Sequence, residues 1–253
     1  MYDYPEHVRP SEAQIAAALP ESNYRHVHLD AVAQTVFFDH AGVRIDFGGI
    51  GKGYAVDRGI AVLQGLGVTR AMVNAGGDSR IIGDRFGKPW LIGIRDPDDR
   101  NRTILKIPLT DTAFSTSGDY ERFFDEGGVR YHHILDPRTG KSPHVVRSVT
   151  IIGPYATRTD ALTKSVFVMG VKDGIDFINT LPDIDAVAIT PPWGSAAFAT
   201  LPEPHAGTLP PPAATGGTHA LRRRWSRYWP HDRESALRPA LLPAACPKRR
   251  CGG

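Results

Sequence analysis

The sequence predicts an α+β fold, with an antiparallel sheet that carries helices on one face and is followed by a disordered tail. Short strand-like runs separated by glycine and polar turn residues dominate the first part of the chain. Two consecutive helical patterns follow between residues 159 and 181. The composition then changes near residue 190. Strands and helices in this order pack most simply as one sheet with helices against it.

Four helical segments are expected. The first is short, at Ala13–Leu19, and follows the capping-box pattern Ser11-Glu-Ala-Gln14. The second starts near Gly51, repeats apolar residues at helical spacing and ends at Gly67. The last two are Thr159–Met169 and Asp173–Leu181.

Strands make up most of the remaining folded part, and a hairpin is expected across Asp125-Glu-Gly-Gly128. The other expected strands are His26–Leu29, Thr35–Asp39, an apolar run that begins at Arg44, Arg70–Val73, Arg80–Ile82, Trp90–Ile94, Thr103–Pro108, Ser148–Ile152 and Ala186–Ile189.

Closely spaced glycines join the run after Arg44 to the second helix, in Gly48-Gly-Ile-Gly-Lys-Gly53. Glycines let a ligand approach the backbone. A helix that starts near Gly51 directs its free N–H groups and the positive end of its dipole at an anion, and Lys52 adds a full charge. The spacing is neither that of a P-loop nor that of a dinucleotide-binding fold. A tight strand–helix turn without a ligand explains this segment equally well.

A second polar segment, Tyr131 to Gly140, reads Tyr-His-His-Ile-Leu-Asp-Pro-Arg-Thr-Gly. Proline pushes Asp136 towards an extended conformation, and Gly140 can close the turn with a positive φ. One histidine is therefore held at the end of a strand. A strand-to-turn transition with an exposed polar edge remains the alternative for this segment alone.

Six motifs occur in a fixed order along the chain. They are Ile45-Asp-Phe-Gly-Gly-Ile-Gly-Lys-Gly-Tyr-Ala-Val-Asp57, Val73-Asn-Ala-Gly-Gly-Asp78, Trp90-x-x-Gly-Ile94 with Asp96-Pro97, Ser115-Thr-Ser-Gly-Asp-Tyr120, His133-Ile-Leu-Asp-Pro-Arg-Thr-Gly140, and Asp160-Ala-Leu162 before Phe167-Val-Met-Gly170. This order resembles the ApbE family of FAD:protein FMN transferases, from about Pro10 to about Ile189. The resemblance implies a T-fold-like α+β domain, in agreement with the order of the elements.

The resemblance also implies an activity. Such enzymes split the pyrophosphate of FAD, transfer FMN to a threonine or serine of an acceptor protein, here a flavoprotein subunit of a redox complex, and release AMP. His133 matches the family's catalytic histidine and can take the hydroxyl proton near neutral pH. Neighbouring His132 alternates to the other strand face and is expected to be a satisfied polar residue. The positions that match the flavin-nucleotide contacts are Asp46, Lys52, Asp78, Ser117, Gly118 and the backbone of Leu135.

Magnesium is the cation that the resemblance implies, with ligands from the carbonyl of Gly49 and from the side chains of Asp160 and Thr163. Oxygen ligands of this kind suit Mg²⁺. Lys164 stands on the same helix face, where many relatives have threonine, and an ammonium cannot ligate a metal. Magnesium binding is therefore expected to be weakened, and Lys164 either contacts a phosphate or points to solvent.

Both ends of the chain depart from the family. Relatives resemble this sequence only beyond the first part of their length, so the N-terminal part of the family domain is expected to be missing, by truncation or in a compact natural variant. The residues after Met1 lack a secretory pattern although the family is usually periplasmic or membrane-anchored, so the localisation is left open. Two alternatives to transfer activity follow: a relative that binds or hydrolyses FAD, and an inactive fragment.

Residues 1–190 are expected to form the folded domain, and residues 191–253 a disordered tail. The tail holds eleven of the 21 prolines, and nine lysines and arginines against three acidic residues. This composition cannot bury enough apolar surface to offset the entropy of ordering. A nucleic-acid or membrane-surface arm around Arg222-Arg-Arg-Trp225 is less favoured than a disordered or out-of-frame extension. No specific nucleic acid is expected, membrane contact is expected only through the acceptor, and Cys246 and Cys251 imply neither zinc nor a disulfide.

Overall fold

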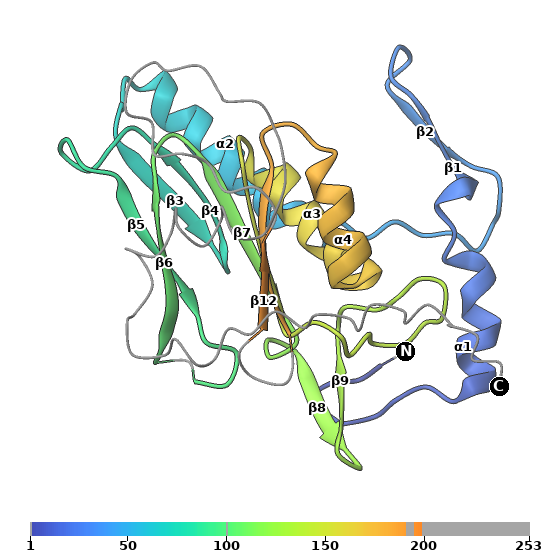
Figure 1. The fold of residues 1–253 in the computed structure, drawn as a ribbon. Coiled ribbons are helices and arrows are strands. Elements are labelled where there is room, and N and C mark those ends of the chain that lie inside the picture. Colours follow the sequence, from blue (N-terminus) through green and yellow to red (C-terminus); the bar gives the residue numbers. More distant parts are fainter. Residues whose placement is uncertain (1, 100, 191–194, 199–253) are drawn as a thin grey trace, which may run out of the picture.

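The computed structural model describes residues 2–99, 101–190 and 195–198 (Figure 1). Its centre is an antiparallel six-stranded sheet in the order β12-β11-β10-β7-β4-β3. These strands are β3 (Ala71–Ala75), β4 (Asp78–Ile82), β7 (Ala113–Gly118), β10 (Ser148–Gly153), β11 (Asp185–Thr190) and β12 (Ser195–Phe198). Three separate hairpins are formed by β1 (Val27–Asp30) with β2 (Thr35–Phe38), β5 (Trp90–Arg95) with β6 (Thr103–Leu109), and β8 (Phe123–Glu126) with β9 (Val129–His132).

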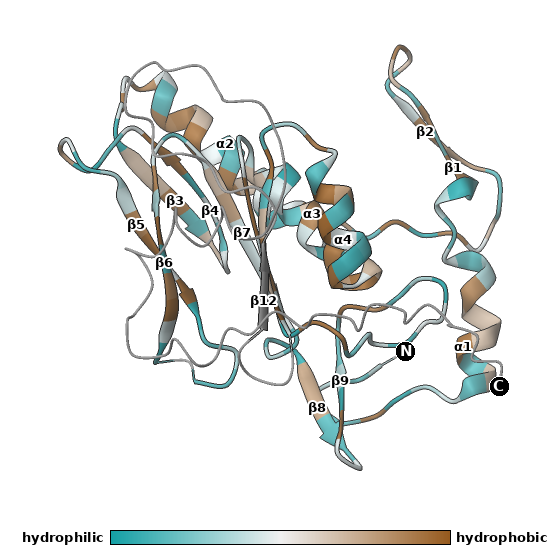
Figure 2. Cartoon of the chain, viewed as in Figure 1, coloured by the Kyte–Doolittle hydropathy of each residue, from teal (hydrophilic) through white to brown (hydrophobic). Residues whose placement is uncertain are grey.

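Three helices cover one face of the sheet, α2 (Gly51–Gly65), α3 (Ala156–Met169) and α4 (Val171–Asn179). Val149 and Ile151 of β10 pack on this side against α3 and α4. Ile152 belongs to the opposite face, where it packs with residues of the β5–β6 hairpin. Figure 2 shows that β6 is predominantly hydrophobic. The predicted α+β fold is confirmed, and the hairpin covers the sheet face that the helices leave free.

Helix α1 (Glu12–Ala18) and the β1–β2 hairpin lie away from the sheet (Figure 1). The predicted capping box at the start of α1 is present, because Ser11 Oγ accepts from the N–H of Gln14 and the side chain of Gln14 accepts from the N–H of Ser11. Two short 3₁₀ turns, Leu19–Glu21 and Tyr24–His26, connect α1 to β1. No helix among the described residues combines the length and the apolar character needed to cross a membrane.

Helix α2 ends at Gly65, just before the glycine that was predicted to terminate it, Gly67. Gly67 has a φ of +80°, and the N–H of Val68 donates to the carbonyl of Leu63 at 3.0 Å. This hydrogen bond, between residues five apart, satisfies a carbonyl at the end of the helix that has no partner within the helix.

The start of α3 differs from the prediction by three residues, because its cap is distant in sequence. Asp57 of α2 accepts hydrogen bonds from the N–H groups of Ala156 and Thr157, at 3.0 and 2.9 Å. Those bonds satisfy two of the donors that a helix start leaves free. A capping residue on another helix leaves no local signal at residues 154–158.

Strand β7 was not predicted, because Ala113-Phe-Ser-Thr-Ser-Gly118 contains mostly small polar residues that are common in turns. It is nevertheless central, between β10 and β4. Its hydroxyl groups are satisfied by partners from other elements: Ser115 bonds to Thr159 of α3, and Thr116 to Thr150 of β10, both at 2.8 Å. Such tertiary pairing makes a polar sequence compatible with a buried strand.

Two further expectations need correction. The run from Arg44 to Phe47 is not a strand, because no described strand lies beside it to supply ladder hydrogen bonds, and Phe47 is exposed. The sheet also continues past the boundary expected at residue 190, since β12 pairs with β11 from Val187↔Phe198 to Thr190↔Ser195. Ser195-Ala-Ala-Phe198 shows neither apolar–polar alternation nor β-branched residues, so no strand was expected there. The rest of the predicted tail, including Cys246 and Cys251, lies outside the described residues.

Candidate active site

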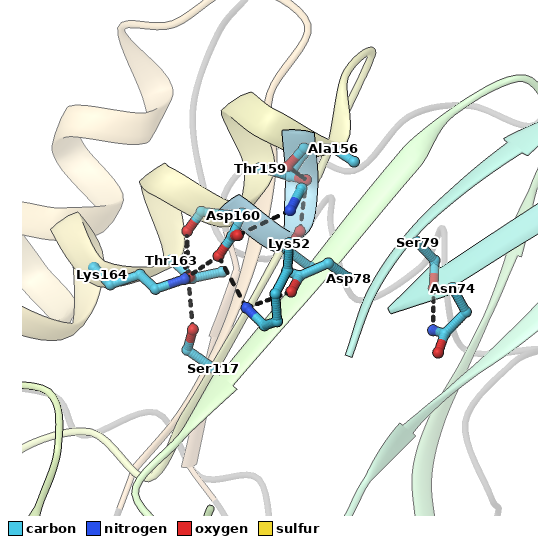
Figure 3. A network of polar contacts seen from close by, with 12 residues as sticks. Lys52, Asn74, Asp78, Ser79, Ser117, Ala156, Thr159, Asp160, Thr163 and Lys164 are labelled. Atoms are coloured by element: carbon cyan, nitrogen blue, oxygen red, sulfur yellow. Dashed lines mark hydrogen bonds and ion pairs between the residues drawn. The ribbon is translucent and has the colours of Figure 1, made fainter. Parts of the chain in front are cut away.

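Asp160 is the centre of a buried polar network between α3 and the start of α2 (Figure 3). Its side chain is fully buried. The Oδ2 atom accepts a hydrogen bond from the N–H of Gly53 at 3.1 Å. The Oδ1 atom contacts the ammonium of Lys164, and the ammonium of Lys52 lies 3.6 Å from it. One carboxylate thus joins the first turn of α2 to two lysines.

Asp78 supplies the second carboxylate of the network. Its Oδ2 atom lies 2.6 Å from Lys52 Nζ, and only 2% of the residue is exposed. Burial raises the pKa of Asp78, and the bonds to Lys52 and Ser115 oppose that shift. Burial by itself lowers the pKa of Lys52, but the two carboxylates outweigh it and raise the pKa. Lys52 therefore stays charged at neutral pH.

The network has a polarity from the protein interior to solvent. The Asp78 and Asp160 side chains are only 3% and 0% exposed, whereas the Lys52 and Lys164 side chains are 45% and 28% exposed. The carboxylates form the floor, and the ammonium groups lie nearer to solvent. An anion that approaches from solvent meets positive charge first.

Hydroxyl groups line the network on the side of β7. Ser117 Oγ and Thr163 Oγ1 are 2.7 Å apart, and Thr163 also donates to the backbone carbonyl of Asp160 at 2.7 Å. Ser115 of β7 and Thr159, one turn earlier on α3, form an equivalent hydroxyl–hydroxyl hydrogen bond. The alternate residues of one strand thus face successive turns of one helix.

The glycine turn before α2 brings α2 and α3 into close contact. The N–H of Gly51 donates to the carbonyl of Phe47 at 2.7 Å, and the N–H of Gly53 is used by Asp160. The anion at this helix start is therefore a side chain of the protein itself. A Cβ at Gly53 would lie 2.2 Å from the carbonyl oxygen of Ala156, so this glycine allows α2 and α3 to approach. The sequence left ligand approach and a tight turn without a ligand open for these glycines, and it did not predict this contact between α2 and α3.

His133 follows directly after β9 and is exposed. Its N–H donates to the carbonyl of Arg122 at 3.1 Å. Partial desolvation lowers the pKa of the His133 imidazole, and the charges of Arg122 and Lys164 lower it as well. Lys164 is thus close enough to act on His133 electrostatically, and the imidazole is neutral at pH 7.

The structure joins five of the predicted site residues and leaves the others apart. Lys52, Asp78, Ser117, Asp160 and Thr163 belong to one network. In the described part of the chain, no hydrogen bond or ion pair links that network to the remaining predicted residues. Asp46 is exposed and accepts from the N–H of Gly48 at 2.6 Å, Gly49 lies in an open turn, Leu135 is half-buried, and Gly118 packs against the ring of Tyr120.

Arg138 lies in the turn of the polar segment at residues 131–140 and pairs with Asp136. Its guanidinium binds the carboxylate of Asp136, with Arg138 Nη2 2.7 Å from Asp136 Oδ2. Gly140 has a φ of +67° and donates its N–H to the carbonyl of Asp136 at 2.7 Å. The arginine stabilises the turn in this structure, and the pair is exposed.

His132 is buried whereas His133 beside it is exposed, in line with the expected alternation, and within the described part of the chain only one of its two ring nitrogens is satisfied as expected. Its Nε2 atom donates to the carbonyl of Pro143 at 2.8 Å, and its ring packs edge-on against Phe167. Its Nδ1 atom has no hydrogen-bond partner among the described residues. Burial lowers the pKa of His132 from its ordinary 6.5 to about 4. The imidazole is therefore neutral in the folded protein.

This burial predicts an acid-sensitive fold. Between pH 6.5 and 4 the unfolded chain binds a proton at His132 and the folded chain does not, so stability falls as the pH falls. We expect a loss of about 2 kcal/mol between pH 7 and pH 5 from this residue. Urea unfolding at the two pH values measures it. His132→Gln, which keeps a donor for Pro143 but does not titrate, should lose less stability over the same interval. An equal loss in both proteins would contradict the assignment.

The comparisons with known proteins agree with this architecture. The sequence model of the ApbE family matches residues 2–188. A protein of Treponema pallidum named FAD:protein FMN transferase is 35% identical over 198 residues, 72% of this chain and 55% of the relative. One of Klebsiella pneumoniae with the same name is 35% identical over 186 residues, 73% of this chain and 57% of the relative. The chain thus spans little more than half the length of these relatives.

Solved structures give the same result. The crystal structure of the ApbE protein from Thermotoga maritima superposes with a TM-score of 0.70 at 41% identity, over 78% of this chain and 64% of that chain. The flavin transferase ApbE from Vibrio cholerae superposes with a TM-score of 0.67 at 30% identity, over 76% and 62% of the two chains. Because the family match extends over nearly all of the sheet and over every residue of the Asp160 network, this chain belongs to the ApbE family.

Proposed function

We propose that this chain transfers FMN from FAD to a serine or threonine hydroxyl of an acceptor protein and releases AMP. The acceptor hydroxyl oxygen attacks the phosphorus of the FMN half. The bond from that phosphorus to the bridging oxygen breaks, and AMP leaves with the electron pair. The hydroxyl proton passes to a base. Phosphoryl transfer of this kind depends mainly on positioning and on charge stabilisation.

One observation carries the proposal. Motifs that are far apart in the sequence meet in a single network of two buried carboxylates and two ammonium groups that lie nearer to solvent, Lys52 and Lys164. Relatives that are 35% identical to this chain are named FAD:protein FMN transferases. Two ammonium groups that lie nearer to solvent than the carboxylates suit the pyrophosphate of FAD, which is anionic.

We assign the base to His133. Its imidazole is neutral at pH 7, it is exposed to an incoming acceptor, and it lies near the charge of Lys164. A neutral imidazole can take the hydroxyl proton when the acceptor oxygen attacks. Lys52, held by Asp78 and Asp160, would orient the phosphates, and Ser117 lies at the edge of the same network.

The residues expected to bind Mg²⁺ do not fit that ion in this arrangement. Asp160 already interacts with Gly53 through one oxygen and with two lysines through the other. Thr163 Oγ1 donates to a backbone carbonyl and bonds to Ser117. A divalent cation here would have to displace an ammonium, so magnesium dependence remains a prediction and no step is assigned to the ion.

A labelling assay tests the proposal. The purified chain is incubated with FAD and a candidate acceptor, a flavoprotein subunit of a redox complex, with and without Mg²⁺. We expect a covalently fluorescent acceptor band after denaturing electrophoresis, together with one AMP per labelled acceptor. An acceptor variant with alanine at the modified hydroxyl is the control and should stay dark.

The other outcomes correspond to the alternatives. Release of FMN and AMP without a labelled acceptor would replace the transferase by an FAD hydrolase. Stabilisation by FAD without AMP would indicate a flavin-binding protein. No response to FAD in any assay would indicate an inactive chain, and the proposal would then be abandoned.

A further inference from the structure

We propose that Lys164 is a tethered cation that occupies the place of a divalent metal at Asp160, so that this chain binds divalent cations poorly until the lysine is removed. Only the part of the inference that concerns FAD binding rests on the proposed function. Its geometry is independent of that function, because it concerns only the Asp160 carboxylate and the groups around it.

Lys164 is held at Asp160 by two contacts. The two residues are separated by one turn of α3, and the Lys164 ammonium contacts both Asp160 Oδ1 and the backbone carbonyl of Asp160, the latter at 2.9 Å. Residues four apart lie on the same helix face, so the ammonium needs no rearrangement of the backbone to stay there. It covers the one carboxylate oxygen that the N–H of Gly53 does not use.

Lys52 is not the main partner of the Asp160 Oδ1 atom. Its ammonium lies 2.6 Å from Asp78 and 3.6 Å from Asp160, so its main partner is Asp78. Without Lys164, the network would contain two carboxylates and one ammonium, a net charge of −1. That negative charge and the freed oxygen would both favour a divalent cation.

With Lys164 present the four charges already cancel. A divalent cation would bring two more positive charges next to two ammonium groups, in a region where both carboxylates are buried. It would also meet no unused carboxylate oxygen at Asp160. Charge repulsion and the lack of a ligand therefore act in the same direction.

Binding of Mn²⁺, measured by electron paramagnetic resonance of the free ion, tests the inference without FAD or an acceptor. We expect no saturable binding to the unaltered chain at millimolar Mn²⁺. Lys164→Thr should bind at least about tenfold more tightly, because it removes a charge and adds a hydroxyl ligand. Lys164→Ala, which only removes the charge, should show an intermediate affinity and serves as a second variant if the threonine variant does not fold.

Lys172→Thr is a matched control. Like Lys164, Lys172 pairs with an aspartate one helical turn away. The partner of Lys172 is Asp176, and the pair lies on the exposed surface of α4. Its replacement should leave Mn²⁺ binding unchanged. FAD-dependent thermal stabilisation in chelator should be retained by the unaltered chain and should become dependent on Mg²⁺ in Lys164→Thr.

Two results would overturn the inference: equally tight Mn²⁺ binding by the unaltered chain and by Lys164→Thr, or no binding by either Lys164 variant. Neither result bears on transfer activity. Conversely, an acceptor that stays unlabelled while Lys164→Thr gains Mn²⁺ binding would remove the proposed function and leave this inference standing.

Discussion

His133→Ala is expected to lower the rate of FMN transfer by about 100-fold or more, with FAD affinity largely unchanged. The reason is that the variant removes the only group assigned to the acceptor proton, whereas the lysines assigned to the phosphates are held by Asp78 and Asp160. Single-turnover labelling gives the rate, and thermal stabilisation by FAD gives the affinity. A transfer rate equal to that of the unaltered chain would remove His133 from the mechanism.

The pH dependence provides a second test of His133. The base must be neutral, and the pKa of His133 is lowered from its ordinary value of 6.5. The rate should therefore fall as the imidazole becomes protonated, with a midpoint below the 6.5 of an ordinary histidine. A midpoint at or above pH 6.5 would contradict the lowered pKa.

The control for His133 should be an exposed histidine. His132→Ala is not a suitable control, because His132 is fully buried against Phe167 and its truncation would leave a cavity. His144 is exposed and is assigned no role in transfer. His144→Ala should leave the transfer rate unchanged.

Gly53→Ala is expected to destabilise the fold by about 3 kcal/mol. The added Cβ would lie 2.2 Å from the carbonyl oxygen of Ala156 and 2.8 Å from the backbone nitrogen of Thr157. Backbone atoms cannot move aside as a flexible side chain can, so α2 and α3 must separate. That movement would also break the bond from Gly53 to Asp160. Urea unfolding measures the loss, and FAD-dependent stabilisation should weaken in the same variant.

Gly65→Ala is the matched control in the same helix. Apart from its chain neighbours and the backbone of its own helix, no described atom lies within 4 Å of the position that its Cβ would take. Alanine has the higher helix propensity, so this variant should be unchanged or more stable by about 0.5–1 kcal/mol. If Gly53→Ala were as stable as Gly65→Ala, close approach of the two helices would not be the reason for the glycine.

The sequence alone determined the elements that carry local signals. The capping box at Ser11, the helix end at Gly67 and the paired glycines of the β8–β9 hairpin all appear at or next to their predicted places. Each depends on residues close together in the chain, where backbone preference and a neighbouring side chain decide the conformation. The order of six motifs likewise identified the family without a structure.

Only the tertiary structure decided the features whose partners are distant in sequence. The sequence of β7 resembles that of a turn, and Ser115 and Ser117 are satisfied in a strand only because they bond to hydroxyl groups of α3. The start of α3 likewise depends on Asp57, which lies in another helix. The site follows the same rule. The sequence placed Lys164 on the metal-binding face, but its contact with Asp160 and the approach of α2 at Gly53 exist only after two helices pack, because side-chain partners across the fold leave no periodic signal in either segment.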